Sequence, residues 1–184
     1  MRVISGKLKG KTINFLKNFS TRPLKDSVKE NIFNILMHSN SFNIDIKNST
    51  ILDLYSGVGS FGIECISRGA NKVMFIEQDK FACEILIKNL NQLSIIDQAK
   101  LINDKIENAI PQNKKFDIFF FDPPFADTKY LKNLKSLKES NSFKKNHLII
   151  IHREKNSKDS HEKHMKILLT KIYGRSKIVF GVFN

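Results

Sequence analysis

This chain of 184 residues contains no tryptophan, only two cysteines and four prolines, and no long hydrophobic run. Such short apolar runs cannot cross a bilayer as helices, and residues 1–7 lack the apolar core of a secretion signal. Cys65 and Cys83 do not have the spacing of metal ligands, so buried free thiols are the simplest expectation. We therefore expect a cytoplasmic protein without a membrane segment or a bound metal.

Acidic residues are also scarce, since 18 Asp and Glu stand against 31 Lys and Arg and leave a net charge of +13. The net charge is +6 in residues 1–30, −3 in residues 31–128 and +10 in residues 129–184. A near-neutral centre between basic ends favours a core with nucleic-acid-binding margins, although solvated lysine-rich surfaces are the alternative. The length and the hydrophobic content of 41% predict one domain over residues 1–184, which we expect to be a monomer.

The first 40 residues have the pattern of a small extension. Alternating residues around Gly6 and Gly10 predict a short β-hairpin over residues 2–15 that carries several lysines. Farther on, Ser27 and Glu30 have the spacing of a capping box and predict the start of an amphipathic helix. We expect this hairpin and helix to dock on a core formed by residues 50–184.

The core alternates between strand and helix patterns. Helices are expected at 61–67, 81–93, 106–110 and 129–139, and strands at 51–55, 73–77, 100–103, 117–122, 148–151, 167–173 and 178–183. This order is typical of an α/β fold with a mostly parallel, doubly wound sheet. Gly174 separates the last two strands and predicts that the sheet ends in an antiparallel hairpin.

A glycine-rich turn follows the first core strand. Gly57 and Gly59 allow a cofactor to approach the backbone, and Gly62 allows close packing of the next helix. Glu77 ends the following strand, where a carboxylate can accept both hydroxyls of a ribose. The sequence therefore predicts a cofactor that contains a nucleoside.

By itself this pattern fits a nicotinamide dinucleotide as well as S-adenosylmethionine. Asp53 at the base of the turn suits a cationic amino-acid donor and is awkward beside a pyrophosphate. The chain also lacks a second substrate domain, and hydride transfer does not call for the motif at residues 122–125. S-adenosylmethionine is thus favoured. Asp104 could contact its adenine, or it could cap the helix that follows.

The second motif, Asp122-Pro123-Pro124-Phe125, ends the apolar run 118–121. An amine on a base ring is a poor nucleophile, and Asp122 with the Pro123 carbonyl could accept its two N–H groups and align its lone pair. The prolines fix the backbone, and Phe125 offers a flat face for a base. The alternative is a stiff turn in which Asp122 acts only as a cap.

The histidines carry no predicted function. His161 and His164 lie in a charged run without the spacing of a helical zinc site, so solvent exposure is expected. His147 and His152 flank a strand and are interpreted as ordinary edge residues.

Several blocks of the sequence stand out together: Arg2–Gly6, Gly10-Lys11, Arg22-Pro23, Asp26–Glu30, Phe33-Asn34, Asp53–Glu64, Phe116–Phe125 and Tyr173-Gly174. These blocks resemble those of the bacterial RsmD-like methyltransferases, which modify a guanine N2 amine of 16S ribosomal RNA. The amino-terminal blocks are the specific part of the resemblance, because the central motifs are shared with other amine methyltransferases. Lys29 stands where the family has an arginine, which suggests a weaker phosphate contact there.

The resemblance implies a class I, Rossmann-like methyltransferase of the small-subunit ribosomal RNA. The implied catalytic residues are Asp122, Pro123, Pro124 and Phe125. The implied cofactor-binding residues are Asp53, Tyr55, Ser56, Gly57, Gly59, Glu77, Gln78 and Asp104. Expected phosphate contacts are Arg2, Lys7, Lys9, Lys11, Arg22 and Lys25.

Two other functions remain open at this point. The Asp122 motif also serves a DNA adenine-N6 methyltransferase, although the chain has no segment long enough for a domain that reads duplex DNA. A non-catalytic RNA-binding or ribosome-assembly protein with a relict fold is the alternative of another class. The intact Asp53, Glu77 and Asp122 argue against it.

Overall fold

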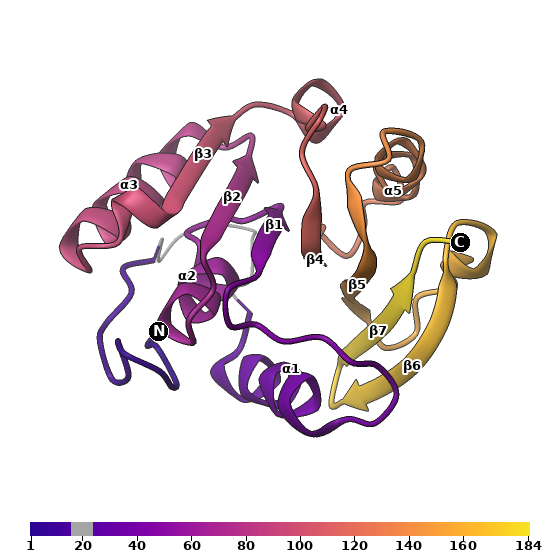
Figure 1. Ribbon diagram of the computed structural model, residues 1–184, viewed down its shortest axis with the longest axis horizontal. Coiled ribbons are helices and arrows are strands. Elements are labelled where there is room, and N and C mark those ends of the chain that lie inside the picture. Colours follow the sequence, from indigo (N-terminus) through magenta and orange to yellow (C-terminus); the bar gives the residue numbers. More distant parts are fainter. Residues whose placement is uncertain (16–23) are drawn as a thin grey trace.

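The computed structural model describes residues 1–15 and 24–184 and contains a seven-stranded sheet in the order β3-β2-β1-β4-β5-β7-β6 (Figure 1). The strands from β3 to β5 pair in parallel, whereas β7 runs antiparallel to both β5 and β6. The predicted fold class is therefore confirmed. The strands are β1 Thr50–Leu54, β2 Lys72–Glu77, β3 Ala99–Asn103, β4 Phe116–Phe121, β5 Phe143–Glu154, β6 Lys166–Tyr173 and β7 Ser176–Val182.

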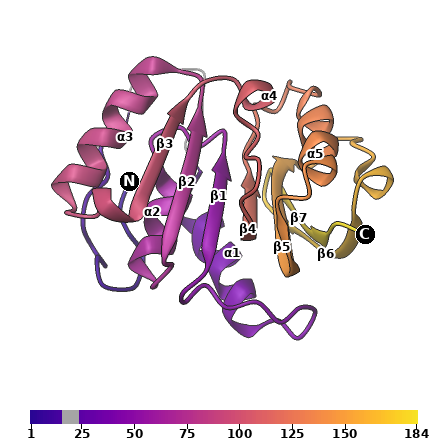
Figure 2. The same ribbon diagram turned by 45° about the horizontal axis from the view of Figure 1, so that its top comes forward.

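Helices cover both faces of the sheet (Figures 1 and 2). One face carries α1 Asp26–His38, α2 Ser60–Ser67 and α3 Lys80–Gln92, and the other carries α4 Ile106–Ala109 and α5 Tyr130–Glu139. Two 3₁₀ turns, η1 Ile96–Gln98 and η2 His161–Lys163, lie in the connections. The chain is thus wound on both sides of one sheet, as expected for alternating strands and helices.

The apolar run of β4 supplies the core on both faces, because successive strand residues point to opposite sides. Phe120 stacks on Phe61 of α2 with ring centroids 3.9 Å apart, and Phe61 stacks in turn on Phe33 of α1 at 5.2 Å. Phe119 and Phe121 instead join the cluster formed with α5. A Cβ at Gly62 would lie 2.2 Å from the Phe75 ring, so glycine is required for α2 to approach β2.

The amino-terminal hairpin is much reduced. The chain turns back, but among the described residues its strand pairing is a single bridge between Arg2 and Thr12. The backbone N–H groups of Ile4 and Ser5 instead donate to the carboxylate of Glu64 in α2, at 2.7 and 3.0 Å. Backbone hydrogen bonds of 2.9 to 3.0 Å still join residues 1–3 to residues 10–13, so the predicted hairpin is present in a shortened form that is fastened to α2.

Two local predictions also need correction. Helix α1 begins at Asp26 after Lys25, without a side-chain cap, so the predicted capping box is wrong. Strand β5 begins well before the predicted residue 148. Its first half was hidden by polar side chains, one of which, Lys144, pairs with Asp117 of β4 at 2.8 Å.

Three of the histidines contradict the sequence interpretation. His147 and His152 are buried within β5, and His161 is buried with its Nε2 2.6 Å from the Tyr130 hydroxyl. The surrounding charged residues suggested exposure, yet the ring of each histidine packs inward with a specific polar partner. Burial lowers the pKa values of His147 and His161, which favours their neutral forms.

Both cysteines are free and buried, as predicted. Over residues 1–15 and 24–184, no helix has the length and apolar character needed to span a bilayer. The same ranges hold no cluster of three or more His, Cys, Asp or Glu side chains that could bind a metal ion.

Candidate active site

The two motifs meet at one edge of the sheet. Because β1 pairs in parallel with both β2 and β4, the residues that follow Leu54, Ile76 and Phe121 lie at neighbouring strand ends. The end of β3 joins this row through the pairing of Glu77 with Asn103. Carboxyl ends of parallel strands are where open α/β sheets bind ligands, so the predicted site has the expected location.

The glycine turn has an unusual backbone. Tyr55, Gly57 and Gly59 have φ values of 58°, 54° and 86°. A Cβ at Gly59 would lie 2.3 Å from Leu86 of α3, so glycine is required there. A Cβ at Gly57 would meet no protein atom within 4 Å, which leaves room for a ligand against the backbone. The left-handed backbone at Tyr55 costs on the order of 1 kcal/mol, and such strain is concentrated at functional sites.

Two side chains hold this turn to neighbouring elements. Glu77 at the end of β2 accepts hydrogen bonds from the Gly57 N–H at 2.8 Å and from the Asp79 N–H at 2.9 Å. The Tyr55 hydroxyl accepts from Asn133 Nδ2 of α5 at 3.0 Å. The carboxylate of Glu77 thus lies at the turn, where a ribose was predicted, and Tyr55 connects the turn to the opposite face of the sheet.

Asp53 is almost completely buried, at 1% exposure, and its Oδ2 accepts from the Gly62 N–H at 2.9 Å. Burial raises its pKa well above the usual range, the nearby Asp122 and Glu77 add to the increase, and the Gly62 hydrogen bond opposes it. Asp53 therefore anchors the first turn of α2 through Gly62, and its burial favours the protonated, neutral form.

The remaining predicted cofactor residues are less constrained. Ser56 is buried and donates its N–H to the Ile76 carbonyl at 3.2 Å, whereas Gln78 and Asp104 are exposed. Asp104 Oδ1 accepts from the Lys105 N–H and from Asn108 Nδ2, both at the start of α4. Asn103, which the sequence did not single out, donates to the Glu77 and Gln78 carbonyls at 2.9 and 3.1 Å and joins the ends of β2 and β3.

Asp122 does not stand alone at the end of β4. Its half-buried carboxylate places Oδ1 2.7 Å from Nδ1 of His152, and Nε2 of His152 lies 2.9 Å from the Ser176 hydroxyl. The Phe125 ring, 38% exposed, stands nearly perpendicular to this imidazole at 5.5 Å. β5 and β7 thus bring two polar side chains to the predicted catalytic motif.

The backbone after Asp122 wraps around one buried arginine. Arg153, which is 1% exposed, donates to the Pro124, Phe125 and Asp127 carbonyls at 2.9 to 3.0 Å and to the Pro123 carbonyl at a longer 3.5 Å. Its Nε donates to Asp159 at 2.8 Å, and its guanidinium lies 4.5 Å from the Tyr130 ring centroid. The shape of this loop therefore depends on Arg153 as well as on the prolines.

The sequence interpretation missed both His152 and Arg153. They are consecutive polar residues that directly follow the apolar run 148–151. Two polar residues at the end of a strand that was predicted near Asp122 were the signal in the sequence that could have identified them. Their neighbours in space are far away along the chain, because Ser176 belongs to β7 and Asp159 to the connection before β6. A motif search based on local spacing could not bring these residues together.

The predicted phosphate contacts fall into separate places. Arg2 lies near the first turn of α2, since its carbonyl accepts from Lys29 Nζ, which also donates to Ser60. Lys7 lies at the other end of α2, about 12 Å along a helix of this length, where its N–H donates to the Ser67 carbonyl. Lys9, Lys11 and Lys25 are exposed, and Arg22 lies outside the described residues.

Lys29 requires a correction. It is fully buried, with Nζ 3.7 Å from Glu64 and 2.8 Å from the Arg2 carbonyl, and burial lowers its pKa although Glu64 opposes this. A side chain in this position cannot contact a phosphate in solution. Position 29 therefore acts within the protein, by joining α1 to the amino-terminal segment and α2.

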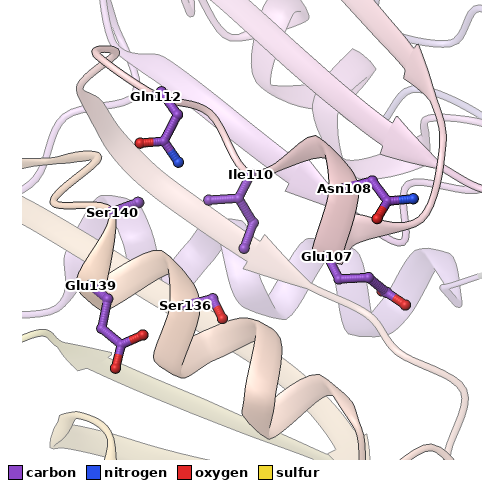
Figure 3. A pocket seen from close by; sticks show the side chains of 7 residues that line it. All are labelled: Glu107, Asn108, Ile110, Gln112, Ser136, Glu139 and Ser140. Atoms are coloured by element: carbon purple, nitrogen blue, oxygen red, sulfur yellow. The ribbon is translucent and has the colours of Figure 1, made fainter.

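A surface depression of about 470 Å³ lies between α4 and α5 (Figure 3). Ile110 projects into it, and Glu107 and Glu139 contribute carboxylates. The predicted cofactor and catalytic residues do not line it. Its two acidic side chains disfavour a phosphate group, so this depression is not part of the candidate active site.

The sheet order, the helices on both faces and the glycine turn with a carboxylate on the next strand define a class I methyltransferase fold. The structure of the Escherichia coli protein yhhF, described provisionally as a methyltransferase, superimposes with a TM-score of 0.84 at 25% identity over 100% of this chain and 98% of that one. The ribosomal protein L11 methylase of Lactobacillus delbrueckii subsp. bulgaricus shares the fold, with a TM-score of 0.64 at 17% identity over 75% of this chain and 71% of that one.

The chain belongs to the family described as Conserved hypothetical protein 95, whose sequence model matches residues 1–182. It is 38% identical over 159 residues to ribosomal RNA small subunit methyltransferase D of Haemophilus influenzae, covering 84% of this chain and 79% of the relative. The protein of the same name from Buchnera aphidicola subsp. Baizongia pistaciae is 36% identical over 154 residues, which are 84% of this chain and 76% of the relative. The resemblance to RsmD-like methyltransferases is thereby confirmed.

Proposed function

We propose that this protein transfers a methyl group from S-adenosylmethionine to the N2 amine of a guanine in 16S ribosomal RNA. One observation carries the proposal: the glycine turn with Glu77 and the polar motif at Asp122 lie at neighbouring strand ends, so a methyl donor and a planar amine can meet between them. The ribosomal substrate follows from the names of the relatives. We assign the activity to one domain, residues 1–184, in which residues 1–40 assist RNA binding.

The residues at the turn fit S-adenosylmethionine. The empty space in front of Gly57 admits a ligand, and Glu77 can accept the ribose hydroxyls. The carboxylates of Glu77 and Asp122 favour a molecule that carries a sulfonium and an ammonium group, and the buried Asp53 anchors the turn beside them. Tyr55, Ser56 and Gly59 would line the turn, with Gln78 and Asp104 beside the adenosine. When bound, the cofactor supplies an electrophilic methyl group.

Asp122 and Pro123 supply the acceptors for the amine. The Asp122 carboxylate accepts one N–H, and the Pro123 carbonyl accepts the other through the lone pair that its long contact with Arg153 leaves free. These two bonds pull the nitrogen lone pair out of conjugation with the base ring. Asp122 then takes the proton that the methylated amine must release. The exposed Phe125 ring lies beside Asp122 and offers a surface on which the base can stack.

Methyl transfer assays test the proposal directly. Purified protein and tritiated S-adenosylmethionine should label naked 16S RNA or assembled small subunits, and nucleoside analysis should identify N2-methylguanosine. Methyladenine in duplex DNA would instead establish the DNA methyltransferase alternative. Failure to bind S-adenosylmethionine in calorimetry would contradict any methyltransferase activity and support a non-catalytic RNA-binding protein.

A further inference from the structure

His152 has partners on both ring nitrogens. Nδ1 lies 2.7 Å from Asp122 Oδ1, and Nε2 lies 2.9 Å from the Ser176 hydroxyl. An ionised carboxylate can only accept, so Nδ1 must carry the proton that is donated to Asp122. The serine hydroxyl can donate to Nε2 of a neutral ring or accept from a charged one, because its proton rotates freely. Ser176 therefore keeps the ring in this orientation in either charge state.

The hydrogen bond from His152 determines which oxygen of Asp122 is available. It engages Oδ1, whereas the residues that the structure describes give Oδ2 no hydrogen-bond partner. β5 is parallel and adjacent to β4, and its central position in the sheet fixes the backbone that carries His152. The imidazole is buried, so solvent does not compete strongly for the bond. Asp122 is thus held in one orientation with a free acceptor oxygen.

Charge gives a second reason for this contact. Asp122 and Glu77 lie close enough to the buried Asp53 to raise the pKa of Asp53, so three carboxyl groups share this end of the sheet. His152 is the neighbour that donates a hydrogen bond to Asp122. Among the charged groups near the motif, Arg153 is directed to the loop carbonyls and Asp159, not to Asp122.

We propose that His152, supported by Ser176, is a positioning residue that holds the Asp122 carboxylate in one orientation and directs its free oxygen toward the substrate amine. The inference rests on the proposed amine methylation. In that reaction a nitrogen–carbon bond forms as the sulfur–carbon bond of the cofactor breaks, and one amine proton passes to Asp122. His152 contributes a hydrogen bond before and after this step and does not contact the substrate.

The test compares three substitutions in the full-length protein. His152→Leu removes both hydrogen bonds and should lower kcat about 10- to 100-fold, with little change in KM for S-adenosylmethionine, because a misplaced catalytic group affects the chemical step. His152→Asn places an amide N–H near the position of Nδ1 and should recover part of the loss. Ser176→Ala should give a smaller decrease than His152→Leu.

A matched control separates this role from stability. His147 is also a buried histidine of β5, but its ring contacts the Lys144 carbonyl and the Phe183 N–H, away from Asp122. His147→Asn should lower the melting temperature. At temperatures where this variant is folded, its kcat should stay near the wild-type value. A decrease in kcat for His152→Leu that melting curves fully explain would overturn the inference.

Failure of the inference can be distinguished from failure of the proposed function. If the wild-type protein transfers no methyl group to ribosomal RNA, the function itself is wrong. If the wild type is active and requires Asp122, but His152→Leu retains the wild-type kcat, the function stands and the role of His152 is refuted. Partial recovery by His152→Asn supports the hydrogen bond over a purely steric role of the ring.

Discussion

The amino-terminal segment, residues 1–15, and the loop of residues 122–127 are both irregular stretches of backbone. Each is held by its own buried charged side chain. Glu64 of α2 accepts the N–H groups of Ile4 and Ser5, whereas Arg153 of β5 donates to the carbonyls of residues 123–127. The anion fixes backbone donors, and the cation fixes backbone acceptors. Only the second arrangement orders carbonyl oxygens, which are the acceptors that the proposed amine substrate requires.

The residues that resemble the family have two kinds of role, one in holding the structure together and one proposed in the chemistry. Lys29 and Gly6 belong to blocks that resemble the family, yet Lys29 is buried and a Cβ at Gly6 would lie 2.0 Å from the Ser67 carbonyl. Both residues keep the segment in place against α2. In the loop of residues 122–127, by contrast, Asp122 is partly exposed and Phe125 is exposed, as the proposed contact with a substrate requires. The following substitutions test this difference, from the largest expected effect to the smallest.

Replacing Asp122 by alanine should have the largest effect. It removes an acceptor for the amine and the acceptor of its proton, so kcat should fall roughly 10³-fold or more. Calorimetry should show that S-adenosylmethionine still binds. The exposed Asp97 of η1 provides a matched carboxylate, and Asp97→Ala should retain wild-type activity. Substantial methyl transfer by Asp122→Ala would contradict the proposed amine contacts.

Arg153→Met should destabilise the protein and disorder the loop of residues 122–127. The change removes the donors to the loop carbonyls and leaves Asp159 buried without its partner, which costs about 3–5 kcal/mol of unfolding free energy in comparable cases. Urea denaturation measures this loss. The double substitution Arg153→Met with Asp159→Leu should restore part of the stability without restoring kcat. Recovery of both would show that Arg153 has no part in shaping the loop for catalysis.

Lys29 and Lys25 form a matched pair in the amino-terminal region. Lys29→Met leaves Glu64 with one fewer buried partner and should lower the unfolding free energy by about 1–3 kcal/mol. Lys25 is exposed, so Lys25→Met should leave stability unchanged while weakening RNA binding and reducing its dependence on salt by about one phosphate contact. Filter binding at several salt concentrations measures this dependence. If Lys29→Met changed it and Lys25→Met did not, Lys29 and not Lys25 would be the phosphate contact.

Asp53→Asn should stabilise the protein at alkaline pH but not at acidic pH. Burial raises the Asp53 pKa in the folded state, so the folded protein binds a proton more readily and loses stability as pH rises above the unfolded value of about 4. Asparagine does not titrate and can still accept the Gly62 N–H. Melting temperatures at pH 4 and pH 8 measure the difference, and an equal change at both values would contradict it. Affinity for S-adenosylmethionine should decrease.

The sequence predicted the fold well where local patterns decide structure. The runs that became β1, β2 and β4 are mostly apolar, β2 ends at Glu77 and β4 is followed by Asp122, so their strand assignment was clear from the local pattern. It failed at the start of β5, where polar side chains on both faces hide a strand that is paired along β4. The amino-terminal hairpin is also shorter than the local pattern suggested, because the N–H groups of Ile4 and Ser5 donate to Glu64 of α2 and not to a paired strand.

The sequence also revealed only part of the candidate site, namely the residues that lie in local motifs. Gly57, Glu77 and Asp122 could be identified because each lies at or just after the end of a strand in a recognisable motif. His152 and Arg153 could not, since their contacts depend on how β5 and β7 place Ser176 and on the fold of residues around Asp159. Local spacing thus indicates the candidate site, whereas the long-range order of the sheet decides which residues support it.

The insertion of β7 between β5 and β6 has a consequence for the order of assembly. The glycine turn, Glu77 and Asp122 are all synthesised before the strand that carries Ser176. The ring of His152 therefore gains its contact with Ser176 only after β7 has been added to the sheet.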